Sequence, residues 1–257
     1  MQFVKPPLAC GMGALDSSSL LECTSLDLQG ALHNATADAT VARLAELLRV
    51  PGGSPRLGSV LLADNPIGET GLDLLVPALV GHASLRHIKL DACGIGASGA
   101  ATLAAALAMG ANWSTLSLSW NPIGPNGAAA LAAAIAAPAT PLARLHLGNC
   151  QLGGIGAKSL ASALGNGSRL SALTLDQNRI RDDGAIALAD ALAANAHLRA
   201  LDLGYNNIGE PGAVSLARGL ARNRALGKSE LPLPMGAGSR GRAPITDGRV
   251  WSRHHLT

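Results

Sequence analysis

The side chains that could do chemistry are few, and histidine comes closest to forming a pattern. His87, Lys89 and Asp91 alternate along one short segment, an arrangement that could bind a metal or relay a proton. The next histidine of this kind, His146, lies two copies further along a repeated pattern. If those copies form neighbouring strands, the two histidines are about 10 Å apart. Such a separation excludes a shared metal or proton relay, so ordinary surface histidines are the simpler interpretation.

The remaining candidates for chemistry are weaker. His254 and His255 are adjacent near the end of the chain, and two neighbouring ligands do not make a closed metal site. The glycines recur at a fixed period instead of clustering, and no G-x-x-x-x-G-K-[ST] phosphate-binding motif occurs. The sequence therefore predicts no catalytic residue, no metal site and no cofactor, and we expect a protein that is not an enzyme.

The four cysteines bear on the cellular compartment. Cys93 and Cys150 occupy the same core position in two copies of the repeat, too far apart to be bridged without distortion. Cys23 begins a degenerate first copy, and Cys10 stands alone near the start. We interpret all four as reduced thiols, which favours a reducing compartment. With no secretory signal and no membrane span apparent, we predict a cytoplasmic location, with the nucleus as the alternative.

The elements that position these residues follow a repeat of 28 residues. Apolar residues stand at relative positions 0, 3, 5 and 10, Asn or Cys at 8, Gly at 14, and Leu or Ile at 18 and 22. A seventh, weaker copy precedes the six regular ones. A fixed period of this length is typical of a solenoid. The six regular copies begin at Leu57, Leu85, Trp113, Leu142, Leu170 and Leu198.

Each copy predicts a short strand followed by a helix. The segment 173-LTLDQN-178 alternates apolar and polar residues, and the alanine-rich second half of each copy favours helix. The Asn at position 8 is expected to bond its own turn and the next repeat, and the Gly at position 14 indicates a close backbone approach. Glu69 and Glu210 suit the N-termini of their helices. Pro77 predicts a kink or a shortened helix.

With this spacing, the chain resembles a known family. The segment 170-LSALTLDQNRIRDDGAIALADALAANAHL-198 is similar to the ribonuclease-inhibitor-like class of leucine-rich repeats. That class includes ribonuclease inhibitor, the sensor region of NOD-like receptors and the Ran GTPase-activating protein. The resemblance is strong over residues 57–223 and weak over 23–56. It implies an α/β horseshoe with a parallel β-sheet on the concave side and helices on the convex side, which commonly binds another protein through the concave face and its rim.

The domain organisation follows from where the repeat holds. We predict an irregular N-terminal segment over 1–22, a leucine-rich repeat domain of about seven repeats over 23–226, and a disordered basic tail over 227–257. The tail carries five Lys or Arg and two acids, and the rest of the chain balances fifteen basic residues against fifteen acidic ones. A neutral body gives no footprint for nucleic acid. The last repeat lacks a polar cap, which leaves self-association through uncapped ends open.

The expected binding surface consists of the outward positions 2, 4, 6 and 7, which the scaffold leaves free. Two of the five aromatic residues, Trp120 and Tyr205, fall at position 7 on the rim. Aromatic side chains of this kind are enriched at interface hot spots. The alternative for Trp120 is that it shields the adjacent turn at Asn121 and Pro122. The candidate partner-binding residues are His87, Lys89, Asp91, Trp120, Arg144, His146, Asp176, Gln177, Asp202 and Tyr205.

These observations predict a non-enzymatic scaffold or recognition module that binds another protein through its concave face. Two alternatives remain open. One is a regulator that activates a GTPase in the manner of the Ran-activating protein, by positioning residues on its partner. The other is the repeat portion of a NOD-like receptor.

Overall fold

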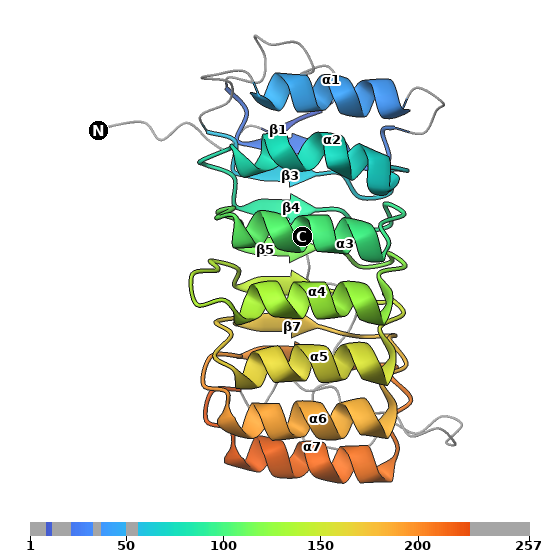
Figure 1. The fold of residues 1–257 in the computed structure, drawn as a ribbon, viewed down its shortest axis with the longest axis vertical. Helices are drawn as coiled ribbons and strands as arrows, with labels where there is room; N and C mark the ends of the chain where they lie inside the picture. Colours follow the sequence, from blue (N-terminus) through green and yellow to red (C-terminus); the bar gives the residue numbers. More distant parts are fainter. Residues whose placement is uncertain (1–8, 12–21, 33–36, 50–55, 227–257) are drawn as a thin grey trace.

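The computed structural model describes residues 9–11, 22–32, 37–49 and 56–226. Within them, strands and helices alternate along the chain, and every strand pairs in parallel with the next one in the sequence to form a single sheet (Figure 1). The strands are β1 (Ala9–Cys10), β2 (Ser25–Asp27), β3 (Ser59–Leu61), β4 (His87–Lys89), β5 (Thr115–Ser117), β6 (Arg144–His146), β7 (Ala172–Thr174) and β8 (Ala200–Asp202). The helices are α1 (Ala37–Arg49), α2 (Gly68–Val80), α3 (Ala97–Ala108), α4 (Gly124–Ala136), α5 (Gly153–Gly165), α6 (Arg181–Ala194) and α7 (Glu210–Arg222).

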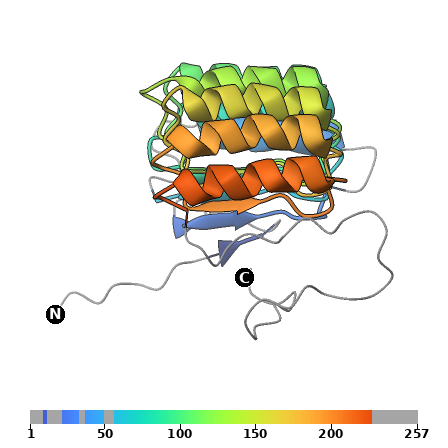
Figure 2. The same cartoon turned by 90° about the horizontal axis from the view of Figure 1, so that it is seen from below.

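The helices form one layer that covers one face of the sheet (Figure 2). The core lies between the two layers, because the apolar residues at positions 3 and 5 of each copy point from the sheet toward the helices. Leu116, Leu145 and Leu173 are aligned in neighbouring strands and buried. Alanine lets adjacent helices pack closely, as Ala128 does on α4. The α/β leucine-rich-repeat solenoid that the repeat predicts is confirmed.

The asparagine at position 8 joins each repeat to the one before it. The side-chain oxygen of Asn121 accepts hydrogen bonds from the backbone N–H groups of Cys93 and Ile95, each at 2.9 Å. Its amide nitrogen donates to the carbonyl oxygens of Leu90 and Leu118, at 2.7 and 2.9 Å. The prediction of bonds within its own turn is confirmed, but the bonded neighbour is the preceding repeat and not the next one.

Cysteine takes the same position with fewer bonds. The Cys93 thiol donates to the carbonyl oxygen of Leu62 at 3.1 Å and has no group equivalent to the amide oxygen. Cys93 and Cys150 are both free and buried, as the sequence predicted. Burial raises the pKa of each thiol to about 12. Both are therefore inert structural thiols.

The glycine at position 14 marks the close contact between helices that the sequence predicted. At Gly127 on α4, an added Cβ would lie 2.9 Å from the Cβ of Ala100 and 3.2 Å from the Cα of Ala97 on α3. The first distance is too short for carbon atoms that are not bonded and the second is unusually tight, so a larger residue would push the helices apart.

The alternative of a shortened helix at Pro77 is wrong, because α2 contains Pro77 and has 13 residues, the same length as α4. Glu69 and Glu210 lie in the first turns of α2 and α7, as the sequence predicted. Glu69 has a further role, since it accepts a hydrogen bond at 2.9 Å from the N–H of Gly96, the N-cap residue of α3. The acid thus also caps the helix of the next repeat.

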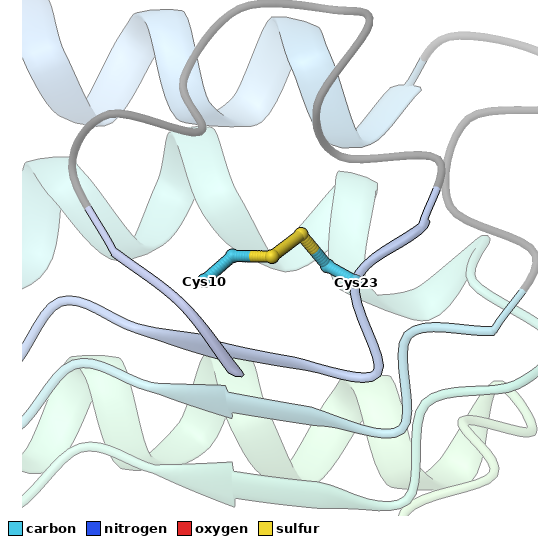
Figure 3. Close-up of a disulfide and its surroundings, with 2 residues drawn as sticks. All are labelled: Cys10 and Cys23. Atoms are coloured by element: carbon cyan, nitrogen blue, oxygen red, sulfur yellow. A yellow bond between two sulfur atoms is a disulfide. The ribbon is translucent and has the colours of Figure 1, made fainter. Parts of the chain in front are cut away.

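The N-terminal end of the sheet differs most from expectation. Within the segment predicted to be irregular, Ala9–Cys10 forms β1 and pairs with β2. Cys10 and Cys23 are joined by a disulfide with Cα atoms 5.9 Å apart (Figure 3). The prediction of four reduced cysteines is therefore wrong for this pair, because parallel pairing of β1 with β2 brings Cys10 beside the start of β2. A disulfide is unusual in a reducing compartment, and the cytoplasmic location stays a prediction.

At the other end, β8 forms the edge of the sheet and α7 closes the helix layer. The outer side of α7 is less covered than its neighbours: Ala217 is exposed, whereas the equivalent Ala189 of α6 is buried. The predicted disordered tail over 227–257 lies outside the described residues. Among the described helices, none is long and apolar enough to cross a membrane.

Candidate protein-binding surface

The face of the sheet opposite the helices carries the residues at positions 2, 4 and 6, and we call it the open face. The turns that follow the strands carry position 7, and we call this edge the strand-end rim. Within the described chain, the ten predicted site residues all lie on these two surfaces. His87, Lys89, Arg144, His146 and Asp202 are strand residues, and Asp91, Trp120, Asp176, Gln177 and Tyr205 follow the strands.

The first cluster on the open face joins three neighbouring strands. Thr115 on β5 lies between His87 on β4 and Arg144 on β6. Its hydroxyl oxygen is 3.1 Å from Nδ1 of His87 and accepts a hydrogen bond at 3.0 Å from Nε of Arg144. Partial burial and the nearby Arg144 and Arg86 lower the pKa of His87. The histidine is therefore a neutral member of a hydrogen-bonded row and not a cation at neutral pH.

The second cluster on the open face contains Lys89 and Asp91, whose charges lie close together. One carboxylate oxygen of Asp91 accepts hydrogen bonds from the Ser117 hydroxyl at 2.6 Å and from the Ser119 N–H at 2.8 Å. The other oxygen lies 3.9 Å from Nζ of Lys89, which donates at 2.8 Å to Gln29. These contacts hold both charged groups in position, and the positive charge of Lys89 offsets the negative charge of Asp91.

His146 belongs to a separate pair. Its Nδ1 lies 2.9 Å from the hydroxyl oxygen of Thr174 on β7. Burial lowers its pKa; Asp91 acts in the opposite direction and Arg144 lowers it further. Strand β5 separates it from the strand of His87, so the two histidines do not share a site, as the sequence predicted. Among the described residues, no group of three or more His, Cys, Asp or Glu side chains could hold a metal ion.

The C-terminal part of the open face is acidic. Asp202 accepts a hydrogen bond at 2.9 Å from the N–H of Gly204, and Asp176 accepts one at 3.0 Å from the side chain of Gln177. Burial raises the pKa of Asp202, and the negative charge of Asp176 raises it further. The Asp176 carboxylate lies over Gly148, in the space that a Cβ there would fill. No lysine or arginine of the described chain forms an ion pair with either carboxylate.

The strand-end rim presents two large aromatic side chains. Trp120 is 58% exposed and Tyr205 is 73% exposed. Both have a left-handed backbone, with φ of 64° and 55°, and so do Asn149 and Gln177 at the same position in the two intervening repeats. By contrast, Trp113 is fully buried in the core. The rim therefore exposes aromatic surface at two points about three strand spacings apart, or roughly 14 Å.

The sequence predicted which residues lie on the open face and the rim, but not the hydrogen bonds that join them. It did not single out Thr115, Thr174, Ser117 or Gln29, which link the charged residues across strands. Their signal was present, since small hydroxyl side chains at positions 2 and 4 of adjacent copies face histidines and an aspartate. The left-handed backbone at position 7 had no obvious signal, because Trp and Tyr are unusual there.

The repeated unit matches a known family model. Four stretches match the family described as Leucine Rich repeat, at residues 114–132, 139–161, 170–189 and 194–217. They contain strands β5 to β8 and much of helices α4 to α7. The ribonuclease-inhibitor-like subclass stays a prediction. No curated protein sequence shows a significant match to the chain.

Several solved structures are similar to the chain at low sequence identity. Actin-binding site 2 of leiomodin-1 is 21% identical, with 48% of this chain and 71% of that chain covered and a TM-score of 0.43. A chain of the yeast Rad7 and Elc1 complex is 16% identical, with 93% of this chain and 71% of that chain covered and a TM-score of 0.48. A chain of the complex of TLR13 with ssRNA13 is 19% identical, with 86% of this chain and 34% of that chain covered and a TM-score of 0.46. At these TM-scores the similarities support no conclusion about fold or function. The family match shows leucine-rich repeats within residues 114–217, which lie in the solenoid of parallel strands and helices described above.

Proposed function

We propose that the chain is a non-enzymatic scaffold that binds another protein through the open face and the strand-end rim. The observation that carries this proposal is the pair Trp120 and Tyr205. Both are bulky, largely exposed and held in a left-handed backbone conformation. That conformation costs a residue other than glycine about 1–2 kcal/mol. Every regular repeat has this conformation, so the strain belongs to the scaffold and the choice of an aromatic residue does not. An exposed aromatic residue at such a position is better explained by contact with a partner than by the stability of the free protein.

The polar residues between the aromatics support the same proposal. The charged side chains of the open face are hydrogen-bonded in place, so a partner would meet a rigid surface with little loss of side-chain entropy. Lys89 and Asp91 form an ion pair with each other, whereas no described lysine or arginine forms one with Asp176 or Asp202. The partner surface that suits this face therefore presents a basic group opposite β7 and β8 and apolar pockets for the two aromatics.

The test compares capture of partners by three forms of the chain. The wild type is compared with the double variant Trp120→Ala, Tyr205→Ala, and with Met109→Ala as the matched control. Met109 follows helix α3, is 70% exposed, and lies on the edge opposite the rim. We expect the double variant to lose a protein that the wild type and the control both retain, while all three keep the same melting temperature.

Capture of the same proteins in equal amounts by the double variant would contradict the proposal. No observation on the described residues favours the GTPase-activating alternative or a receptor fragment, and neither is proposed further.

A further inference from the structure

A pocket of about 370 Å³ lies at the C-terminal end of the solenoid, on the edge opposite the strand-end rim. Residues 193–196, at the end of α6 and just beyond it, form one wall. Arg199 before β8, Arg222 in the last turn of α7, and Arg224 and Ala225 after α7 form the rest. Since the helix-to-strand loops carry the pocket and the strand-to-helix turns carry the rim, the two surfaces share no residue.

The backbone around this arginine pocket is held by two asparagine side chains. The amide nitrogen of Asn223 donates at 2.6 Å to the carbonyl oxygen of Leu192 and at 2.8 Å to that of Asn195. Its side-chain oxygen accepts bonds from the N–H groups of Ala225 and Leu226. Asn195 is itself buried and donates to Leu164 at 2.9 Å. The three arginines therefore project from fixed loops and a fixed helix end, so the pocket does not depend on loop ordering.

Among the described residues, none compensates the charge of the pocket. Arg199, Arg222 and Arg224 are exposed, and no described residue forms a side-chain hydrogen bond or ion pair with any of their guanidinium groups. The rest of the lining is alanine and asparagine, with no carboxylate. Three permanent positive charges around one hollow repel each other, and an anion in the hollow would relieve that repulsion.

We propose that the arginine pocket binds a phosphoryl group carried by a phosphorylated segment of a protein partner. Guanidinium groups bind phosphate oxygens through paired hydrogen bonds, and arginine is the preferred residue for this contact. The alanine wall leaves room for a phosphorylated side chain as well as the phosphoryl group itself, since 370 Å³ lies in the range of small-ligand sites. The protein source of the phosphoryl group rests on the proposed scaffold function, but the recognition of the group does not.

The experiment titrates the full chain with three probes at 150 mM salt, a concentration that screens weak long-range attraction. The probes are inorganic pyrophosphate, a phosphoserine peptide and the same peptide without phosphate. We expect the first two to bind and the third not to bind. The double variant Arg199→Gln, Arg224→Gln should weaken the binding of both probes at least tenfold. The control Arg179→Gln removes an exposed arginine outside the pocket and should leave both affinities within twofold of wild type.

Three results would overturn the proposal: no binding of the phosphoserine peptide, equal binding of the unphosphorylated peptide, or equal weakening by the control variant. All variants change exposed side chains, and matching melting temperatures would show that they fold. The variant Trp120→Ala, Tyr205→Ala should bind pyrophosphate like the wild type. Failure of the arginine pocket can therefore be told apart from failure of the strand-end rim.

Discussion

At the scale of single residues, position 7 has a backbone conformation set by the scaffold and a side chain that the scaffold leaves free. Every regular repeat has a left-handed residue there, including Asp64, Ala92 and Asn149. The solenoid thus requires the conformation and leaves the side chain free. Asparagine adopts it with least strain, whereas tryptophan and tyrosine are unusual choices. The aromatics at Trp120 and Tyr205 are therefore additions to the scaffold, and their removal should not harm it.

The substitution Trp120→Asn tests this view. Because asparagine fits the left-handed conformation and Trp120 is mostly exposed, the free energy of unfolding should stay unchanged or rise by up to ~1 kcal/mol. Urea denaturation measures the change. A fall of more than about 1 kcal/mol would instead support the alternative in which Trp120 shields the turn at Asn121 and Pro122.

The half-buried His146 of the open face gives the fold a dependence on pH. His146 has a lowered pKa when folded, mainly because of burial, and recovers the ordinary value of about 6.5 when unfolded. Between those values the unfolded chain binds more protons, so the free energy of unfolding should fall as pH drops below about 6.5.

The variant His146→Gln should show a smaller loss of stability between pH 7.5 and pH 5.5 than the wild type, by urea denaturation at each pH. His197→Gln, which removes an exposed histidine outside the open face, serves as the control. Equal slopes for His146→Gln and the wild type would show that His146 does not titrate differently on folding.

At the scale of elements, each repeat completes the one beside it. Asp182 at the start of α6 accepts hydrogen bonds from the N–H groups of Gly209 at 2.7 Å and Gly212 at 3.2 Å, which begin α7. The next residue, Asp183, forms only an exposed ion pair with Lys158. These two neighbours have the same chemistry but different contacts, and they make a matched comparison.

We expect Asp182→Ala to lower the free energy of unfolding by about 1–2 kcal/mol, as the loss of a helix cap does. Asp183→Ala should change it by less than about 0.5 kcal/mol, because exposed ion pairs contribute little. Hydrogen exchange should show faster exchange in α7 for Asp182→Ala alone. Equal effects of the two substitutions would mean that the bonds to α7 do not stabilise it.

The local pattern in the sequence predicted the elements, and contacts between repeats account for what it missed. Apolar spacing located the strands and the helix stripe because each is read within one copy. The caps from Glu69 and Asp182 cross between copies, so no single copy reveals them. Strand β1 has two residues, too few for an alternation to be recognised, and it forms because β2 offers a free edge. The candidate surface was located for the same reason as the strands, although its hydrogen-bonded links were not.

At the scale of the whole molecule, the solenoid contacts run only between neighbouring repeats, so its two ends differ from its middle. At the N-terminal end, the disulfide between Cys10 and Cys23 links β1 to the residues just before β2. The C-terminal end leaves Ala217 and Val214 of α7 exposed. Self-association through this end stays a prediction, since α7, like α1 at the other end, packs against a described helix on one side only.

The state of the cysteines can be counted directly by alkylation and mass spectrometry. The folded chain should take up no label at pH 8, because two thiols are bridged and the other two are buried with a pKa of about 12. Unfolding without reductant should expose Cys93 and Cys150 only, and reduction should add Cys10 and Cys23. Labelling of all four cysteines before reduction would contradict the disulfide.

The most direct test of the proposed binding surface is oxidative footprinting of the chain, free and bound to the protein that it captures. Trp120 and Tyr205 are exposed and readily oxidised, and Met109, which is 70% exposed after helix α3 on the opposite edge, is the internal reference. The account predicts that the partner protects Trp120 and Tyr205 and leaves Met109 reactive. Protection of Met109 with Trp120 and Tyr205 still fully oxidised would place the interface elsewhere and contradict it.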